Sequence, residues 1–172
     1  MAENFPMQLR EEEAADIPIL RRLIERAFAD LPHSLRNEGA IVDALRDADA
    51  LRLSLVAEQN REILGHVAFS PVKFDEDLGG WFGLGPVAVR PDRQRRGIGR
   101  ALIEEGLQRL QRAGAHGCVV VGDPAYYSRF GFVSDPTLHF EAVPAPYLMS
   151  LTFVPPAPSG KVVFHESFRT RP

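Results

Sequence analysis

Cysteine is nearly absent from this sequence, with a single residue, Cys118, in a chain of 172. No disulfide can therefore form within the chain, which is typical of proteins from a reducing compartment, and we expect a cytoplasmic protein. Cys118 lies in the apolar run 118–121. We therefore expect a buried thiol that serves packing, and not a nucleophile.

Long apolar runs and a leader-like N-terminus are also missing. No apolar run approaches the ~20 residues that a membrane span needs. The first residues are acidic, whereas a signal peptide begins with a basic stretch followed by an apolar one. We therefore expect no membrane partner.

The sequence has no excess of positive charge, because 20 Lys and Arg against 23 Asp and Glu give a formal net charge of −3. A nucleic-acid-binding protein relies on a broad basic surface, so we expect no nucleic-acid partner. The five histidines show no paired ligand spacing, and no metal site is expected.

The length is that of one domain with a core of its own. We predict a single domain over residues 1–172, with a core at about 7–154 and a C-terminal strand and tail at 155–172. The sequence leaves open whether the protein is a monomer or a homodimer.

Two common phosphate-binding motifs are missing as well. No stretch matches the P-loop pattern G-x-x-x-x-G-K-[ST]. Residues 83–88 match the letters of the dinucleotide fingerprint G-x-G-x-x-A, but a strand-like run and a proline follow them where that motif requires a helix. Neither motif therefore explains how the chain could hold a phosphate.

A third kind of phosphate site is present at residues 94–99, which read Q-R-R-G-I-G. They join the apolar run 86–89 to the amphipathic run 98–111, so they form a turn between a strand and a helix. Free N–H groups at the start of a helix attract phosphate, and glycines let a ligand approach the backbone. The turn is surrounded by four arginines: Arg93, Arg95, Arg96 and Arg100. This pattern predicts a pyrophosphate site, and the alternative is a glycine turn with solvated arginines.

The hydrophobic periodicity predicts strands that alternate with helices, typical of an α/β sandwich around a mixed sheet. Strands are predicted at 7–10, 51–58, 63–74, 81–89, 117–121, 147–154 and 161–165. Helices are predicted at 16–28, with Asp16 as N-cap, and at 38–47, 98–112 and 124–130. The strand at 81–89 contains Gly83, Gly85 and Pro86, which interrupt a ladder and predict a bulge or a splay.

The pattern Q-x-x-G-x-G of residues 94–99 resembles the acetyl-coenzyme A loop of the GCN5-related N-acetyltransferase (GNAT) family. Residues 122–132, G-D-P-A-Y-Y-S-R-F-G-F, resemble the second landmark of that family, Y-x-x-x-G-F. Together with residues 65–71 and 84–89, they resemble a YhbS-like branch of the family. The resemblance implies a GNAT-like three-layer α/β fold, with a mixed, mostly antiparallel sheet that splays at the central strand and helices on both faces.

The resemblance implies an N-acetyltransferase that moves an acetyl group from acetyl-CoA to a primary amine by direct attack. It assigns contacts with the thioester and the pantetheine arm to the backbone of Val87, Ala88 and Val89. It assigns the pyrophosphate to the turn, which consists of Gln94, Arg95, Arg96, Gly97, Ile98, Gly99 and Arg100.

The register of the second landmark makes Tyr127, four residues before Gly131, the general acid that protonates the leaving thiolate. A phenol has a pKa of ~10 and is protonated at neutral pH. Tyr126 is the alternative acid, since one residue along a helix turns a side chain by roughly 100°. Either tyrosine could instead be a core residue with a hydrogen-bonded hydroxyl.

The amine must be neutral to attack, and Glu58 and His66 are the possible bases. We expect the acceptor to enter near these two residues and the acidic loop Asp75, Glu76 and Asp77. The alternatives are a solvated Glu, a structural His and a solvated loop. The rival functions are a non-catalytic acyl-CoA-binding sensor or regulatory module, and a protein acetyltransferase that acts on lysines or N-termini.

Overall fold

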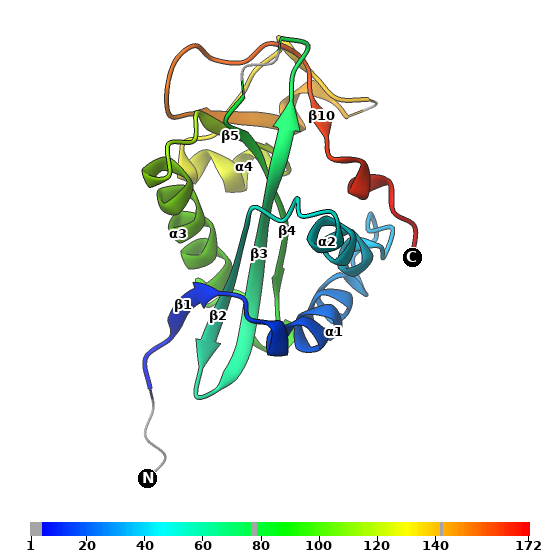
Figure 1. The fold of residues 1–172 in the computed structure, drawn as a ribbon, viewed down its shortest axis with the longest axis vertical. Helices are drawn as coiled ribbons and strands as arrows, with labels where there is room; N and C mark the ends of the chain where they lie inside the picture. Colours follow the sequence, from blue (N-terminus) through cyan, green and yellow to red (C-terminus); the bar gives the residue numbers. More distant parts are fainter. Residues whose placement is uncertain (1–4, 77–78, 142) are drawn as a thin grey trace.

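The computed structural model describes residues 5–76, 79–141 and 143–172, and a mixed sheet runs through its centre (Figure 1). The strand order of this sheet is β1-β2-β3-β4-β5-β8-β6. Its strands are Gln8–Glu11 (β1), Leu53–Gln59 (β2), Glu62–Lys73 (β3), Trp81–Val89 (β4), Gly117–Val121 (β5), Val133–Ser134 (β6) and Leu148–Thr152 (β8). Strands β4 and β5 pair in parallel and the other neighbours pair antiparallel, so the predicted mixed, mostly antiparallel sheet is confirmed.

The C-terminal part of the chain differs from the prediction of one strand at 161–165. Two short strands lie there, Gly160–Lys161 (β9) and Val163–Phe164 (β10). Strand β9 pairs in parallel with Leu138–His139 (β7), while β10 pairs with the end of β3. Strands of two residues carry no readable periodicity, which is why the sequence did not predict β6 and β7.

Helices cover both faces of the sheet, as predicted (Figure 1). One face carries α3 (Ile98–Arg112), and the other carries α1 (Ile17–Phe28) and α2 (Glu38–Asp47). Residues of β2 alternate between the faces, because Leu53 and Leu55 pack with α3 and Val56 packs with α1. The predicted strand 51–58 begins too early, because Leu51 precedes β2 and packs on the side of α1 and α2.

Strand β4 is irregular where its glycines and proline predicted a bulge or splay. Its register against β3 shifts between the pairs Val67–Val87 and Phe69–Leu84, so β4 contains one extra residue there. Its pairing with β5 covers Trp81–Gly83 and stops. From Leu84 to Val89 the backbone therefore has one strand neighbour, β3, among the described residues, and the edge toward β5 is open.

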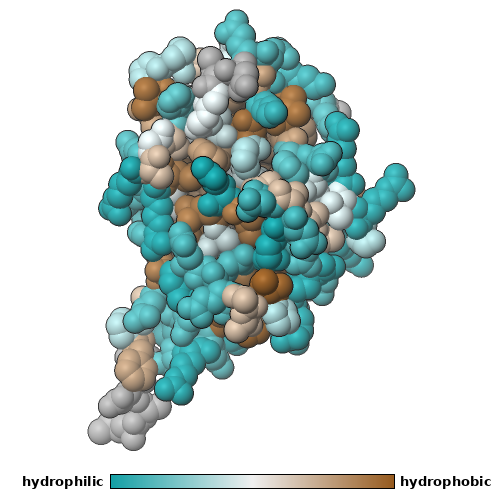
Figure 2. Space-filling view, viewed as in Figure 1, coloured by the Kyte–Doolittle hydropathy of each residue, from teal (hydrophilic) through white to brown (hydrophobic). Residues whose placement is uncertain are grey.

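The surface of the molecule is mostly hydrophilic on the face drawn in Figure 2, where hydrophobic residues show in small groups. Within the described ranges, no helix combines the length and the apolar character required to cross a bilayer. Cys118 is buried, as predicted, and its burial raises the pKa of the thiol.

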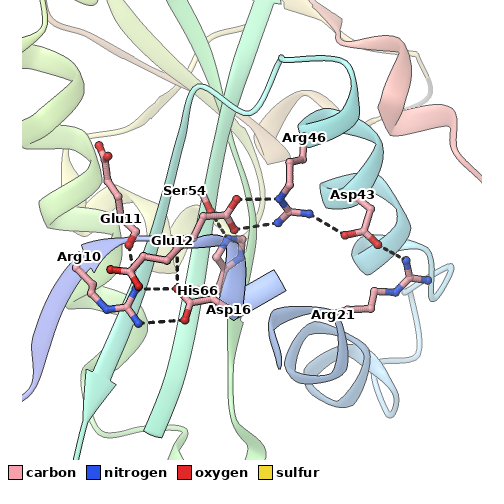
Figure 3. Close-up of polar contacts among 10 residues, drawn as sticks. Arg10, Glu11, Glu12, Asp16, Arg21, Asp43, Arg46, Ser54 and His66 are labelled. Atoms are coloured by element: carbon pink, nitrogen blue, oxygen red, sulfur yellow. Dashed lines mark hydrogen bonds and ion pairs between the residues drawn. The ribbon is translucent and has the colours of Figure 1, made fainter. Parts of the chain in front are cut away.

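A polar network lies between β1 and the two helices α1 and α2 (Figure 3). Asp16 takes the N-cap position of α1 as predicted, but its carboxylate accepts hydrogen bonds from the N–H of Glu13 and from Arg10 and caps no helix N–H. Arg10 lowers the pKa of this carboxyl. Asp16 therefore ties β1 to the start of α1, which is a tertiary role that the capping rule did not predict.

His66 lies in the same layer, on β3, and is fully buried with an exposed fraction of 0%. Its Nε2 shares a hydrogen bond of 2.7 Å with Oγ of Ser54, and its Nδ1 has no partner among the described residues. Burial lowers its pKa from 6.5 to about 4, with smaller opposing effects of Glu12 and Arg46. The folded protein therefore keeps His66 neutral at neutral pH.

This burial predicts a pH-dependent stability. The unfolded chain protonates His66 near pH 6.5, so the free energy of unfolding falls as the pH drops from 6.5 toward 4. In His66→Gln the side chain no longer titrates, so we expect wild type to lose about 2 kcal/mol more than this variant between roughly pH 7 and pH 5 in urea unfolding. The exposed His139→Gln should follow wild type, and parallel curves for wild type and His66→Gln would contradict the prediction.

Candidate active site

A cavity of about 440 Å³ opens where β4 separates from β5. The splayed part of β4 forms one wall, with Leu84, Gly85, Pro86 and Val87. Tyr127 lies in the lining as well. The other walls come from the end of α1, the loop before α2, α2 itself, the end of β5 and the C-terminal part of the chain. Their lining residues are Phe28, His33, Leu35, Asn37, Glu38, Ile41, Val121, Phe140, Phe164 and Phe168.

Tyr127 is positioned by a short helix, α4 (Pro124–Tyr127), which follows β5. The predicted helix 124–130 continues from α4 as a 3₁₀ turn. Asp123 caps α4 by accepting a hydrogen bond of 2.9 Å from the N–H of Ala125. The ring of Tyr127 lies against Gly122, where a Cβ would clash with it. Burial raises the pKa of Tyr127 to about 12, so the phenol is protonated and can donate at neutral pH.

Tyr126 has different surroundings and is not among the described residues that line the cavity. Its hydroxyl lies 3.6 Å from the position of a Cβ at Gly99, near the start of α3. The guanidinium of Arg129 lies 4.6 Å from the centre of its ring. Of the two tyrosines, Tyr127 is therefore the one that a substrate in the cavity can contact.

The turn at residues 94–99 lies beyond the end of the open edge of β4. Gly97 is the N-cap of α3 and has φ +81°, which a residue with a side chain adopts only with strain. Among the described residues no side chain caps α3, so the N–H groups of its first turn are available to a ligand. Gln94 donates from Nε2 to the carbonyl oxygen of Val89 at 3.2 Å and links the turn to β4.

The four arginines around this turn are not equivalent. Arg100 forms an ion pair of 2.8 Å with Glu104, and Arg93 lies 3.6 Å from Asp92. Arg95 and Arg96 are exposed. Within the described part of the chain these two form no ion pair, so their charges are available to an anion at the turn.

Glu58 lies elsewhere, at the end of β2. Its carboxylate accepts a hydrogen bond of 2.8 Å from Nε of Arg10. It lines a second cavity of about 680 Å³ with Arg22, Arg26 and Arg61, and this cavity shares no lining residue with that of Tyr127. The structure therefore does not bring Glu58 and Tyr127 together, and the buried His66 does not line either cavity.

The acidic loop and Glu58 are also far apart. Strand β3 is 12 residues long and spans roughly 40 Å at ~3.3 Å per residue. Glu58 pairs with Ile63 near its start, whereas Asp75 follows its end and accepts a hydrogen bond from the N–H of Lys161. The expectation that both line one acceptor site is wrong, because they lie at opposite ends of the sheet. Asp77 lies outside the described residues.

Several lining residues of the Tyr127 cavity were not predicted from the sequence, among them Glu38, Phe164 and Phe168. Phe164 lies in the predicted strand 161–165, and Phe168 lies in the predicted tail after it. They line the cavity together with residues of α1, α2 and β4, and such long-range contacts leave no signal in the local sequence pattern. Gly122 belongs to the motif at residues 122–132, but the sequence did not predict its contact with the ring of Tyr127. No group of three or more potential metal-ligating side chains gathers in the described ranges.

Comparisons with known proteins agree with this architecture. Residues 51–134 match a family model described as an acetyltransferase (GNAT) domain. An uncharacterized N-acetyltransferase of Escherichia coli K12, YhbS, is 40% identical over 128 residues, which are 73% of this chain and 73% of that protein.

Two crystal structures share the whole fold. A GNAT family acetyltransferase from Brucella melitensis, in complex with acetyl-CoA, has 47% identity and a TM-score of 0.85, covering 95% of this chain and 98% of that one. YhbS from Escherichia coli, in complex with CoA, has 32% identity and a TM-score of 0.87, covering 95% and 92%. These likenesses extend across both helical layers and the splayed sheet, and the chain belongs to the GNAT family of N-acetyltransferases, in a YhbS-like branch.

Proposed function

We propose that this chain transfers an acetyl group from acetyl-CoA to a primary amine by direct attack. One observation carries the proposal: the protonated Tyr127 lies in a cavity at the open edge of β4, and the uncapped start of α3 lies beyond the end of that edge. A thioester held along this edge would lie within reach of the phenol while its phosphates lie at the turn.

The open edge and the turn fit acetyl-CoA. The backbone of Val87, Ala88 and Val89 would pair with the amides of the pantetheine arm, as a neighbouring strand would. The pyrophosphate would bind the turn formed by Gln94, Arg95, Arg96, Gly97, Ile98, Gly99 and Arg100. A Cβ at Gly97 would meet no atom within 4 Å, so the backbone there is open to a ligand. The complexes of the Brucella protein with acetyl-CoA and of YhbS with CoA support this assignment.

Acetyl-CoA, when bound, supplies the acetyl group as a thioester. Backbone N–H groups at the bulge of β4 would polarise the carbonyl as charge builds on its oxygen. Tyr127 would donate its phenolic proton to the sulfur as the carbon–sulfur bond breaks. A non-catalytic acyl-CoA-binding module needs the turn but has no use for this phenol, so Tyr127 favours the enzyme.

The amine loses a proton when it forms the amide. Glu58 and His66 were the candidate bases, but neither lines the cavity of Tyr127. We therefore propose that water in the open cavity takes this proton. The pKa of a free lysine-like amine is ~10.4, so this route predicts activity that rises with pH as the neutral amine becomes more abundant.

We also propose that residues 1–172 act as one domain in the cytoplasm. Phe164 and Phe168, from the segment after residue 154, line the same cavity as Tyr127, so the site needs both parts of the chain. The single cysteine supports a reducing compartment. A monomer and a homodimer are both compatible with this site.

The role of the turn in binding acetyl-CoA can be tested by adding side chains at its glycines. Valine at Gly97 and Gly99 would strain the N-cap and place side chains where the phosphates approach. We expect micromolar-range binding of acetyl-CoA to wild type in titration calorimetry and no detectable binding to the double variant. Gly114→Val, at a second glycine with positive φ just past the end of α3, is the control and should bind normally. Wild-type affinity in the double variant would remove the turn from the proposal.

The acid can be tested by removing one oxygen. Tyr127→Phe keeps the ring against Gly122 and loses the proton donor, so we expect kcat to fall ~10²–10⁴-fold while acetyl-CoA binding changes little. Tyr126→Phe is the matched control, with a kcat near that of wild type. Steady-state CoA release measures both variants. The reverse result, an active Tyr127→Phe and an inactive Tyr126→Phe, would transfer the role to Tyr126.

A further inference from the structure

The cavity that Tyr127 lines has a largely aromatic wall. Four half-buried phenylalanines from three parts of the chain line it: Phe28, Phe140, Phe164 and Phe168. The ring centres of Phe140 and Phe164 are 4.8 Å apart, and those of Phe164 and Phe168 are 5.5 Å apart. These three rings therefore form a continuous surface, and part of it faces the cavity.

This aromatic wall is held in place by contacts with the sheet and with α2. Strand β10 pairs Phe164 with Val72 of β3, and the ring of Phe164 packs against Gly83, where a Cβ would lie 2.8 Å from it. Nδ2 of Asn37 donates a hydrogen bond of 2.8 Å to the carbonyl oxygen of Thr170. This hydrogen bond ties the C-terminal segment to the start of α2. The aromatic wall is therefore fixed in position by the fold.

One carboxylate lines the cavity together with these phenylalanines. Among the described residues that line the cavity, Glu38 is the one carboxylate, and none is Lys or Arg. Glu38 is half-buried at the start of α2 and accepts a hydrogen bond of 2.6 Å from Oγ of Ser34, which orients the carboxylate. His33 is the other titratable side chain on this side of the cavity. The cavity therefore favours a cation over an anion.

We propose that the acceptor is a small aromatic amine whose ammonium group is attracted by Glu38 and whose ring packs on Phe164 and Phe168. This inference rests on the proposed function and specifies its substrate. The volume of about 440 Å³ is that of a small-molecule site. Aromatic rings favour stacking and edge contacts with a flat ligand, and an ammonium ion near a ring face gains further attraction.

The same wall disfavours other acceptors. A polyamine or an aminoglycoside would lose water from several polar groups, and the phenylalanines offer no hydrogen bonds in return. A lysine or an N-terminus of a protein brings a polar backbone with the same cost. An amino acid with a free carboxylate would place a second negative charge near Glu38.

The substrate class is tested by CoA release with five probes: 2-phenylethylamine, phenylalanine amide, phenylalanine, 1,4-diaminobutane and a lysine-containing peptide. We expect kcat/KM to be highest for the first two, and phenylalanine amide to exceed phenylalanine about tenfold, because the two differ by one carboxylate. Preference for 1,4-diaminobutane or the peptide would overturn the inference and leave the proposed function standing. No release with any amine, together with normal acetyl-CoA binding, would overturn both.

Glu38→Gln and Phe168→Leu test which residues set the preference for the acceptor amine. In Glu38→Gln the hydrogen bond from Ser34 can persist and the charge is lost, so the preference for phenylalanine amide over phenylalanine should fall from about tenfold to near one. Glu105→Gln, on α3 and paired with Arg109, should keep the wild-type preference. An unchanged ratio in Glu38→Gln would show that Glu38 does not select the charge of the acceptor.

Phe168→Leu keeps apolar volume and removes the ring, so we expect KM for 2-phenylethylamine to rise about tenfold with little change in kcat. Phe153→Leu, in a separate surface groove, is the control and should match wild type. Calorimetric titration of 2-phenylethylamine into the CoA-bound protein gives the same comparison without turnover. Equal affinity for wild type and Phe168→Leu would overturn the proposed ring contact.

Discussion

The separation of β4 from β5 after Gly83 is the constraint on which the site depends. A strand in the middle of a sheet normally pairs on both sides, and backbone groups without a partner are costly to bury. Here the glycines and proline of β4 interrupt the ladder, and the two strands diverge around a cavity. The open edge leaves backbone groups of β4 without a partner strand on the side of the cavity that Tyr127 lines. The turn at residues 94–99, at the start of α3, lies beyond the other end of the same edge.

The two faces of the sheet support this opening in different ways. On one face α3 packs through an apolar cluster, and Gly106 lets the helix approach so closely that a Cβ there would clash with Phe69. This contact holds α3 close against β3. On the other face α1 and α2 cover a layer in which His66 and Ser54 pair and Arg10 joins Asp16 to Glu58. His66 and Glu58 thus have structural partners of their own, and neither is among the described residues that line the cavity of Tyr127.

Several elements were predictable from local pattern. The bounds of α2, α3, β4 and β5 agree with prediction, because each has a clear period or a clear start and stop signal. The turn at 94–99 and the bulge in β4 follow from glycine and proline chemistry in the same way. The short strands β7, β9 and β10 were missed or merged, because two residues cannot show a period. Glu58 and Asp75 were predicted to lie at one site, but the 12 residues of β3 separate them.

The sequence by itself determined the fold class, the irregular strand β4 and the glycine turn at residues 94–99. These features depend on residues that are neighbours in the chain. The sequence also singled out two adjacent tyrosines, with Tyr127 as the predicted acid and Tyr126 as the alternative. Tertiary structure alone decided their surroundings, because Tyr127 packs against Gly122 and lines the cavity, whereas the hydroxyl of Tyr126 lies near Gly99. It also decided the far wall of the cavity, where Glu38, Phe140 and Phe168 meet from distant parts of the chain. Such contacts depend on how the helical layers pack on the sheet, and the spacing of residues along the chain does not predict them.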